Sequence, residues 1–394
     1  MKILFIMIAY PDVKANSSMY TDLTREFSLA GHNVYVAVAN GPKTTSFNLE
    51  YNINVLRVKT LELFKTSFIK KGFVTLLLPF QIERALKKYL QDILFDFIVI
   101  PTPPITFLST VRKLRKKSNL GIYLILRDIF PQNAIDLAIL KNPLLKAYFR
   151  KQEKKLYAIS DYIGCMSPGN ISYIKKHNPE VLPDKLHLLP NWKNVTMYKS
   201  PDSTLKSKYG LDNKFIALYG GNFGRPQQID FILELAKETS YLHDVIFMLI
   251  GEGTEKARLV ELVKKNNLKN VIIKDSLPRD KYQDLVKICD IGLVNLNRKF
   301  SIPNIPSRTL SYWEAKIPVL ASIDQNTDFS SILDESGSGF WSITGDIKSY
   351  KQNFEKLYSN KQLRSTMGEN GYQYLLKNCT TAHAYSIISG KLGL

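Results

Sequence analysis

Hydrophobic and polar positions follow two alternating patterns along the chain, one typical of buried strands and one typical of amphipathic helices. Short apolar runs rich in Val, Ile and Leu, such as "KILFIMIAY" (2–10) and "FDFIVIP" (95–101), are separated by stretches with the spacing of amphipathic helices. Apolar runs of this length and composition are typical of strands that are buried on both faces. The pattern therefore predicts an α/β fold in which helices cover both sides of parallel sheets.

The pattern is interrupted once and then restarts. Residues 189–214 lack apolar periodicity and are rich in turn-forming residues, which is typical of an inter-domain connection. We therefore expect two Rossmann-like, doubly wound domains at 1–190 and 215–378, a connection at 191–214, and a tail (379–394) that crosses back to the first domain. Two such domains facing each other would place a central cleft at the carboxyl ends of both sheets.

The composition narrows the class of partner. The 394 residues carry a net charge of +19, which predicts an anionic partner such as a nucleic acid, a membrane surface or a phosphorylated substrate. The charge is spread along the chain without an aromatic-interleaved basic groove, so a nucleic acid is disfavoured. The three cysteines match no metal spacing, and we expect reduced, packed thiols.

The first residues and the apolar runs bear on location. "MKILFIMIAYPDVK" (1–14) fits a first strand better than a signal peptide, because its apolar run is short and no small-residue cleavage site follows. No other apolar run approaches the ~20 residues that span a bilayer. The sequence therefore predicts a cytoplasmic protein.

Two glycine-rich turns follow strands of the second half. They lie in "YGGNFGRPQQID" (219–230) and "IGEGTEKARL" (250–259). A strand that runs through glycine into a helix lets backbone N–H groups approach a phosphate. The first turn is not a G-x-G-x-x-G fingerprint, so a tight turn without a ligand is the alternative. Two such turns on one sheet edge favour a phosphate site, with the candidates Gly220, Gly221, Asn222, Gly251 and Glu252.

A short amphipathic segment, "PSRTLSYWEAKIPVLAS" (306–322), forms a second candidate region. Ser307 is a good N-cap residue, which predicts a helix from Arg308 to about Lys316. Arg308 in the first turn would face the phosphate. By helical spacing, Ser307, Ser311 and Glu314 share one stripe. Glu314 either reaches a ligand on that stripe, or is exposed, or pairs with Lys316 or Arg308.

Together these motifs resemble the retaining family-4 glycosyltransferases, which have the two-domain GT-B fold. The resemblance rests on "AGHNVYV" (30–36) and on the glycine-rich and amphipathic segments above, in that order. "LRDIFPQNAIDLAIL" (126–140) is similar to the subgroup that builds bacterial surface polysaccharides such as O-antigen and capsule. The resemblance implies transfer of a hexosyl or N-acetylhexosaminyl unit from a nucleotide sugar, and a UDP-sugar is the favoured donor. It implies neither a metal ion nor a cofactor.

The chain departs from the family pattern at the donor site. The family's two glutamates at E-x7-E spacing fall on Pro303 and Ser311, so that either Ser311 or Glu314 would have to hold the ribose. The family's cationic pair falls on Asn222 and Gln227. The candidates that remain for neutralising phosphate charge are Arg225, Arg298, Lys299 and, as the first choice, Arg308. Leu277 and Pro306 complete the expected donor-binding set.

In the first half, Asp128 ends the apolar run of "GIYLILRD" (121–128). A carboxylate at a strand end is placed to orient an acceptor or sugar hydroxyl, although a helix-capping role is the alternative. The resemblance implies that the first turn contacts the acceptor or the diphosphate through Asn16, Ser17 and Ser18.

Basic and apolar residues gather in residues 63–91 and 111–120. Arg84, Lys87 and Lys88 lie beside apolar positions (Phe80, Leu86 and Leu90), which suits a helix lying on anionic lipid. A core helix with a solvated basic face is the alternative. With the resemblance, this surface predicts a peripheral protein on the inner face of the cell membrane that uses a lipid-diphosphate-linked sugar as acceptor.

Two other functions remain as alternatives. Because the family's glutamates are missing, a catalytically inactive partner subunit of a glycosyltransferase complex competes with the enzyme. A nucleotide-sugar epimerase is disfavoured, since no histidine–carboxylate constellation suits base chemistry.

Overall fold

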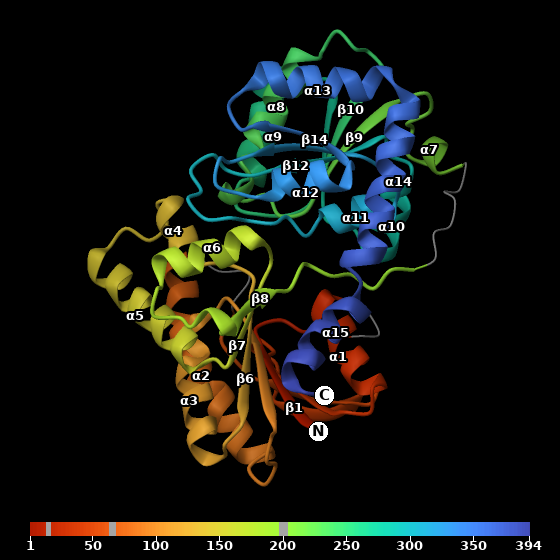
Figure 1. The fold of residues 1–394 in the computed structure, drawn as a ribbon. Helices are drawn as coiled ribbons and strands as arrows, with labels where there is room; N and C mark the ends of the chain where they lie inside the picture. Colours follow the sequence, from red (N-terminus) through yellow and green to blue (C-terminus); the bar gives the residue numbers. More distant parts are fainter. Residues whose placement is uncertain (13–16, 63–67, 197–203) are drawn as a thin grey trace. The chain divides into compact units, whose positions relative to one another are not determined.

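The computed structural model describes residues 1–12, 17–62, 68–196 and 204–394, and it divides into two compact units. The first unit comprises Met1–Pro190 and Thr381–Leu394, and the second comprises Asn191–Thr380. Figure 1 shows the helices and strands of both units. The predicted connection, residues 191–214, therefore belongs to the second unit.

An eight-stranded sheet forms the centre of the first unit, in the order β3-β4-β2-β1-β5-β6-β7-β8. All neighbouring strands are parallel except β3 and β4. The strands are β1 (Lys2–Met7), β2 (Asn33–Ala39), β3 (Ser46–Glu50), β4 (Ile53–Val58), β5 (Phe97–Pro101), β6 (Gly121–Leu126), β7 (Tyr162–Cys165) and β8 (Leu186–Leu188). Tyr51 and Asn52 turn β3 into β4 with φ angles of 50° and 64°. This hairpin was not predicted from the sequence.

Helices cover the first sheet, and the last helix of the chain is one of them. They are α1 (Met19–Leu29), α2 (Phe68–Tyr89), α3 (Leu108–Lys117), α4 (Gln132–Asp136), α5 (Pro143–Ile159), α6 (Pro168–His177) and α15 (Thr381–Leu392), with the 3-10 turns η1 (Ile105–Phe107) and η2 (Pro183–Lys185). Helix α15 packs on α1: the Tyr385 ring lies 4.8 Å from that of Phe27, and its hydroxyl lies 3.2 Å from His32 Nε2. The C-terminal segment is thus part of the first unit.

A six-stranded parallel sheet forms the centre of the second unit, in the order β11-β10-β9-β12-β13-β14. The strands are β9 (Phe215–Gly220), β10 (Val245–Ile250), β11 (Val271–Lys274), β12 (Ile291–Asn295), β13 (Val319–Ile323) and β14 (Gly339–Ile343). Along β9, Ile216 and Leu218 join one core cluster, while Ala217 and Tyr219 join another. Alternate residues are therefore buried on opposite faces, as a doubly wound sheet requires.

The helices of the second unit lie on both faces of this sheet (Figure 1). They are α7 (Leu205–Lys208), α8 (Asp230–Glu238), α9 (Lys256–Lys265), α10 (Arg279–Lys287), α11 (Thr309–Glu314), α12 (Phe329–Ser336), α13 (Ile347–Ser359) and α14 (Lys361–Asn378), with the 3-10 turn η3 (Arg225–Gln227). The predicted α/β class with two Rossmann-like sheets is confirmed.

Helix α2 differs from the membrane-facing helix that was predicted. Leu86 and Leu90 are buried in the first unit, whereas Arg84, Lys87 and Lys88 are exposed. The alternative interpretation, a core helix with a solvated basic face, therefore holds for this part of α2. Phe80 is exposed, and residues 63–67 of the predicted surface lie outside the described residues. Among the described residues, no helix combines the length and the apolar character needed to cross a bilayer.

Candidate active site

Two glycine turns lie side by side at the carboxyl ends of the neighbouring strands β9 and β10. The Gly221 N–H donates to the carbonyl of Ile250 (2.9 Å), and the Phe223 N–H donates to the carbonyl of Glu252 (2.7 Å). A Cβ atom at Gly251 would lie 1.7 Å from the Gly221 carbonyl oxygen, so only glycine fits there. The two turns therefore form one unit, and their backbone hydrogen bonds join them.

This arrangement corrects one expectation about the turns. The predicted role of the glycines was to offer backbone N–H groups to a phosphate. The N–H of Gly220 instead donates to the Tyr312 hydroxyl, and the N–H of Gly251 donates to the carbonyl of Lys274. Together with the bond of Gly221, three candidate amides already have partners inside the protein. These glycines thus provide close packing, and their three amides are not free to bind a phosphate.

Arg308 supplies such a charge directly beside the first turn. Its guanidinium carbon lies 4.3 Å from the centroid of the Tyr219 ring, which is a cation–π distance. A Cβ atom on Gly221 would lie 3.4 Å from the same carbon, so the guanidinium packs against a residue that has no side chain. Among the described residues, nothing accepts a hydrogen bond from the buried Nη1 atom of Arg308. A buried cationic donor without a partner favours an anionic ligand.

Tyrosines that the sequence reasoning did not single out hold this arrangement in place. The Tyr312 hydroxyl accepts from Gly220 N–H and lies 3.2 Å from the carbonyl oxygens of both Leu218 and Leu293. Burial raises the pKa of Tyr312 to about 12, so its phenol stays protonated at neutral pH. The only signal in the sequence is the position of these aromatic residues beside the glycine and amphipathic motifs.

Of the other predicted cations, Arg225 lies in the turn that follows β9, and Arg298 and Lys299 lie in the loop that follows β12. The Asn297 amide donates to the carbonyl of Arg225 (2.9 Å), and the Arg298 N–H donates to the Gln228 side chain (3.2 Å). These bonds bring the loop of Arg298 and Lys299 next to η3. The side chain of Arg225 lies 3.8 Å from Glu255, and those of Arg298 and Lys299 are exposed. The three cations are thus near one another, but they are less confined than Arg308.

The remaining donor-site candidates have local partners of their own. Asn222 donates from its amide to the Gln227 side chain at 3.4 Å, and Glu252 forms an ion pair with Lys256 at 2.8 Å. Leu277 packs against the hydrophobic core of the second unit, and Pro306 is buried. Among the described contacts, none joins Leu277 to the glycine turns. The roles of all these residues in donor binding stay predictions.

The helix start was predicted incorrectly in detail. Helix α11 begins at Thr309, one residue later than expected, and ends at Glu314. Ser307 is exposed, and its carbonyl, not its hydroxyl, accepts from Leu310 N–H (3.2 Å). Ser307 is therefore not a side-chain cap. Because α11 has only six residues, its dipole adds little to a phosphate site, and the Arg308 side chain matters more.

The other end of α11 has a structural partner. Glu314 is buried and pairs with Lys193, with 2.8 Å between Oε2 and Nζ, and it also accepts from the Thr196 N–H at 3.2 Å. Lys193 donates in addition to the Ser311 hydroxyl (3.1 Å). The two structural alternatives for Glu314, an exposed side chain or a pair with Lys316 or Arg308, are therefore wrong; Lys316 pairs with Glu369 instead. A ribose contact by Ser311 or Glu314 stays a prediction.

The candidates of the first unit lie at the carboxyl end of β6 and at the start of α1. Burial raises the pKa of Asp128, and the neighbouring Arg127 partly opposes this shift. Ser18 caps α1: its hydroxyl accepts from the Thr21 N–H (3.2 Å), while the Thr21 hydroxyl accepts from the Ser18 N–H (2.7 Å). Ser18 thus has a structural role, Ser17 is half-buried, and Asn16 lies outside the described residues.

Comparison with known proteins shows what the chain is similar to. Residues 202–374 match the family "Glycosyl transferases group 1". The "Probable glycosyltransferase WbjE" of Pseudomonas aeruginosa is 26% identical over 254 residues, which cover 62% of this chain and 62% of that protein.

Solved structures of similar fold cover the whole chain at low identity. HepE of Anabaena, in complex with UDP and glucose, has a TM-score of 0.73 at 14% identity and covers 100% of this chain and 99% of that one. WaaG, a glycosyltransferase involved in lipopolysaccharide biosynthesis, has a TM-score of 0.68 at 16% identity and covers 98% and 100%. The glycine turns, Arg308 and α11 all fall inside the matched family region. Residues 202–374 are therefore similar to the glycosyl transferases of group 1, and they lie in a chain with the predicted GT-B fold.

Proposed function

We propose that this protein transfers a sugar from a nucleotide-sugar donor, a UDP-sugar in the first place, to a glycan acceptor in polysaccharide synthesis. The observation that carries the proposal is the buried Nη1 of Arg308, which has no hydrogen-bond partner among the described residues and lies beside Gly221. The similarity of the surrounding residues to glycosyl transferases of group 1 and the presence of UDP in the HepE structure support the donor class. The role of WaaG in lipopolysaccharide biosynthesis supports the polysaccharide pathway.

Arg308 would act on the leaving group. When the bond between the anomeric carbon and the diphosphate oxygen breaks, negative charge develops on that oxygen. A fixed guanidinium stabilises this charge more than it stabilises the bound donor, and that difference lowers the barrier. We propose that this cation, together with Arg225, Arg298 and Lys299, makes a metal ion unnecessary. Asp128 would orient the acceptor hydroxyl, and the configuration at the anomeric carbon would be retained.

The net positive charge of the chain is the basis for proposing an acceptor and a location. The net charge of +19 suits an acceptor that carries a diphosphate and is embedded in an anionic membrane. We propose a lipid-diphosphate-linked glycan of the O-antigen or capsule type, used by a protein that is peripheral on the inner membrane face.

A thermal-shift panel of UDP-, GDP- and dTDP-sugars tests the donor class. A ligand that binds only the folded state stabilises it by ~2.7 kcal/mol at a hundred times its dissociation constant. We expect a UDP-sugar to raise the melting temperature in the presence of EDTA, and to lose this effect in Arg308→Ala. Stabilisation by none of the sugars would contradict the proposal, and stabilisation only with added Mg²⁺ would contradict metal independence.

A catalytically inactive partner subunit remains the second candidate. It is favoured by Glu314, whose carboxylate is engaged by Lys193, and by Pro303 and Ser311 at the positions of the family's glutamates. Purified protein with a UDP-sugar and a lipid-linked acceptor separates the two candidates. Transfer or slow donor hydrolysis supports the enzyme, whereas binding without turnover supports the partner subunit.

A further inference from the structure

Four large apolar side chains are exposed within ten consecutive residues at the α4–α5 connection. Ile139 is 39% exposed, Leu144 79%, Leu145 46% and Tyr148 43%. We call these four residues the α5 tip. Leu144, Leu145 and Tyr148 lie on one face of the first turns of α5, by their i, i+1 and i+4 spacing. Scattered exposed leucines need no explanation, but a cluster of this kind marks an interaction surface.

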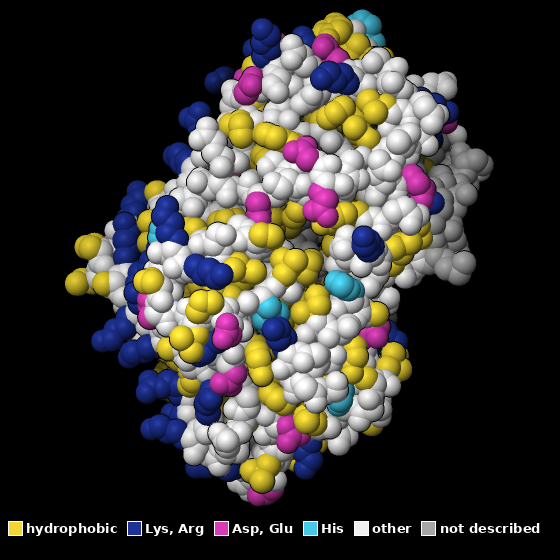
Figure 2. All heavy atoms as spheres, in the orientation of Figure 1, with side chains coloured by type: hydrophobic (Ala, Val, Ile, Leu, Met, Phe, Trp, Pro, Cys, Tyr) yellow, Lys and Arg dark blue, Asp and Glu magenta, His cyan; other side chains and the backbone are white. Residues whose placement is uncertain are grey.

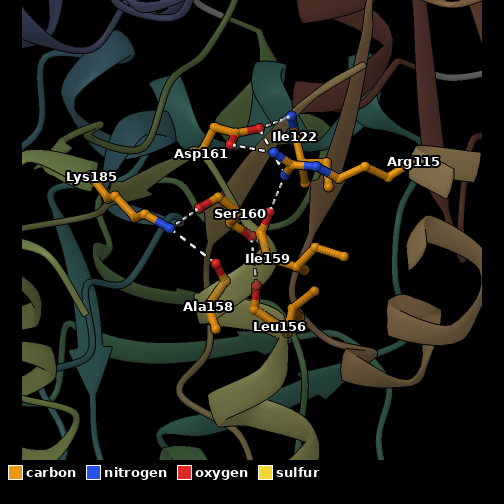
Figure 3. A network of polar contacts seen from close by, with 8 residues as sticks. All are labelled: Arg115, Ile122, Leu156, Ala158, Ile159, Ser160, Asp161 and Lys185. Atoms are coloured by element: carbon orange, nitrogen blue, oxygen red, sulfur yellow. Dashed lines mark hydrogen bonds and ion pairs between the residues drawn. The ribbon is translucent and has the colours of Figure 1, made fainter. Parts of the chain in front are cut away.

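The tip is not part of the hydrophobic core because only the second half of α5 is buried. The buried residues of α5 are Glu153, Leu156 and Tyr157. Figure 3 shows how its carboxyl end is held: Lys185 donates to the carbonyls of Ala158 (3.0 Å) and Ser160 (2.8 Å).

Arg115 adds a second anchor at the same end of α5. It donates to the carbonyl of Ile159 at 2.5 Å and to both oxygens of Asp161, which in turn accepts from Ile122 N–H in β6. The base of the helix is therefore fixed to the sheet and to its neighbours. Its first turns present the tip on a rigid support.

Lysines lie along the helix that carries the tip and just before it. The lysines on and beside α5 that form no ion pair with a described residue are Lys141, Lys146, Lys151 and Lys155. The only carboxylate on α5, Glu153, is fully buried and pairs with Arg150 at 2.8 Å. At the left edge of Figure 2, where Figure 1 places α4 and α5, hydrophobic side chains lie outermost and Lys and Arg side chains flank them.

We propose that the α5 tip inserts into the headgroup region of an anionic lipid bilayer. Leucine side chains would enter the acyl boundary, tyrosine would stay at the polar level, and the lysines would contact lipid phosphates. The charges argue for this occupant over a second copy of the chain, because two tips packed together would bring like charges into contact. The inference places membrane contact on α5, whereas the sequence had pointed to α2.

The choice of partner rests on the proposed function, but the test needs no turnover. Flotation with vesicles of phosphatidylglycerol and phosphatidylcholine measures binding, and the thermal shift with a UDP-sugar on the same variants measures the donor site. If only vesicle binding fails, the tip proposal is wrong; if only the donor response fails, the proposed function is wrong.

Two pairs of substitutions test the apolar and the electrostatic contributions to membrane binding. Leu144→Ser with Leu145→Ser should reduce vesicle binding at least ten-fold at every salt concentration. Lys141→Gln with Lys151→Gln should reduce it by about 25-fold at low salt, since each lysine near an anionic surface contributes about five-fold, and the loss should shrink at high salt. Both pairs are exposed, so unchanged melting temperatures are expected.

Matched controls use similar residues elsewhere in the first unit. Leu29 and Leu94 are 82% and 61% exposed, and replacing both by Ser should leave binding unchanged. Lys87→Gln with Lys88→Gln on α2 should have a smaller effect than the α5 pair. Equal binding of neutral and anionic vesicles, or full binding by the leucine pair, would overturn the proposal. If the leucine pair abolishes a concentration-dependent dimer and leaves vesicle binding intact, the tip is a self-association surface instead.

Discussion

The two ends of α11 carry charges that are used in different ways. Arg308 precedes the helix and lies against Tyr219 and Gly221, with one buried nitrogen unpartnered by any described residue. Glu314 ends the helix and has partners for both oxygens, in Lys193 and Thr196. Under the proposed function a ligand completes the contacts of the first charge, whereas the protein itself completes those of the second. The comparison predicts that one end serves binding and the other serves stability.

The largest expected effect is on stability, at Glu314. Glu314→Ala leaves the buried Lys193 ammonium without its partner, which typically costs about 3–5 kcal/mol. All three tryptophans, Trp192, Trp313 and Trp341, lie in the second unit, so fluorescence-detected urea unfolding reports this unit alone. We expect Glu314→Ala to unfold at a lower urea concentration. At urea concentrations below that midpoint, the variant should still be stabilised by a UDP-sugar.

A double substitution is the control for this result. Lys193→Met with Glu314→Leu removes both charges and should recover much of the lost stability, because no buried charge remains unpaired. If Glu314→Ala instead leaves the unfolding midpoint unchanged and abolishes UDP-sugar binding, Glu314 contacts the ribose and the comparison fails.

The next largest effect is on activity, at Arg308. Loss of one preorganised donor to developing charge typically slows turnover by about 100–1000-fold, or about 2.7–4 kcal/mol. We expect Arg308→Ala to lose this much transfer activity and its stabilisation by UDP. Arg308→Lys should recover only part, since an ammonium lacks the planar fork.

Arg364 is a matched control within the same unit. Its guanidinium carbon lies 5.0 Å from the centre of the Phe215 ring, but it also donates to the carbonyls of Leu357 (2.6 Å) and Tyr358 (3.0 Å). Arg364→Ala should therefore lower stability and leave the donor response intact. An equal loss of donor response in both variants would show that Arg308 has no special role.

A smaller effect, on donor binding, is expected from a substitution at Gly221, which packs against Arg308. Gly221 has a φ of 137°, and a Cβ atom there would lie 3.4 Å from the guanidinium carbon. Gly221→Ala should weaken donor binding about 5- to 30-fold through backbone strain of ~1–2 kcal/mol and a displaced arginine. Gly210 also has a positive φ, of 66°, but no atom within 4 Å of such a Cβ, so Gly210→Ala should leave donor binding unchanged in calorimetry.

The sequence predicted the sheets well because buried strands have a distinctive composition. Strands such as β1 and β9 are continuous apolar runs, whereas β3 (Ser46–Glu50) is largely exposed and was missed. The sequence also located both glycine turns, since they follow strands that proved to be neighbours. It could not show that the amides of Gly220, Gly221 and Gly251 are engaged, because those bonds depend on strand register and on Tyr312.

The partner of Glu314 was beyond prediction for a related reason. Lys193 lies in a segment without periodicity, far away in the sequence, and only the folded second unit brings it to α11. The exposed α5 tip was equally hidden, since an amphipathic pattern does not say whether its apolar face is covered. In both cases the missing information is tertiary contact, which local patterns do not encode.

The smallest expected effect is at Ser311, between the two charged ends. Its hydroxyl accepts a hydrogen bond from Lys193 at 3.1 Å, and such a bond to a charged group contributes ~1.5–3 kcal/mol at most. Because Glu314 still neutralises Lys193, Ser311→Ala should cost ~1 kcal/mol in the unfolding of the second unit and leave the affinity for UDP unchanged. If Ser311 holds the ribose instead, the variant will lose affinity for UDP while keeping its affinity for inorganic diphosphate, which has no ribose. Calorimetric titration with both ligands therefore decides whether the binding role of α11 ends at Arg308 or extends along the helix.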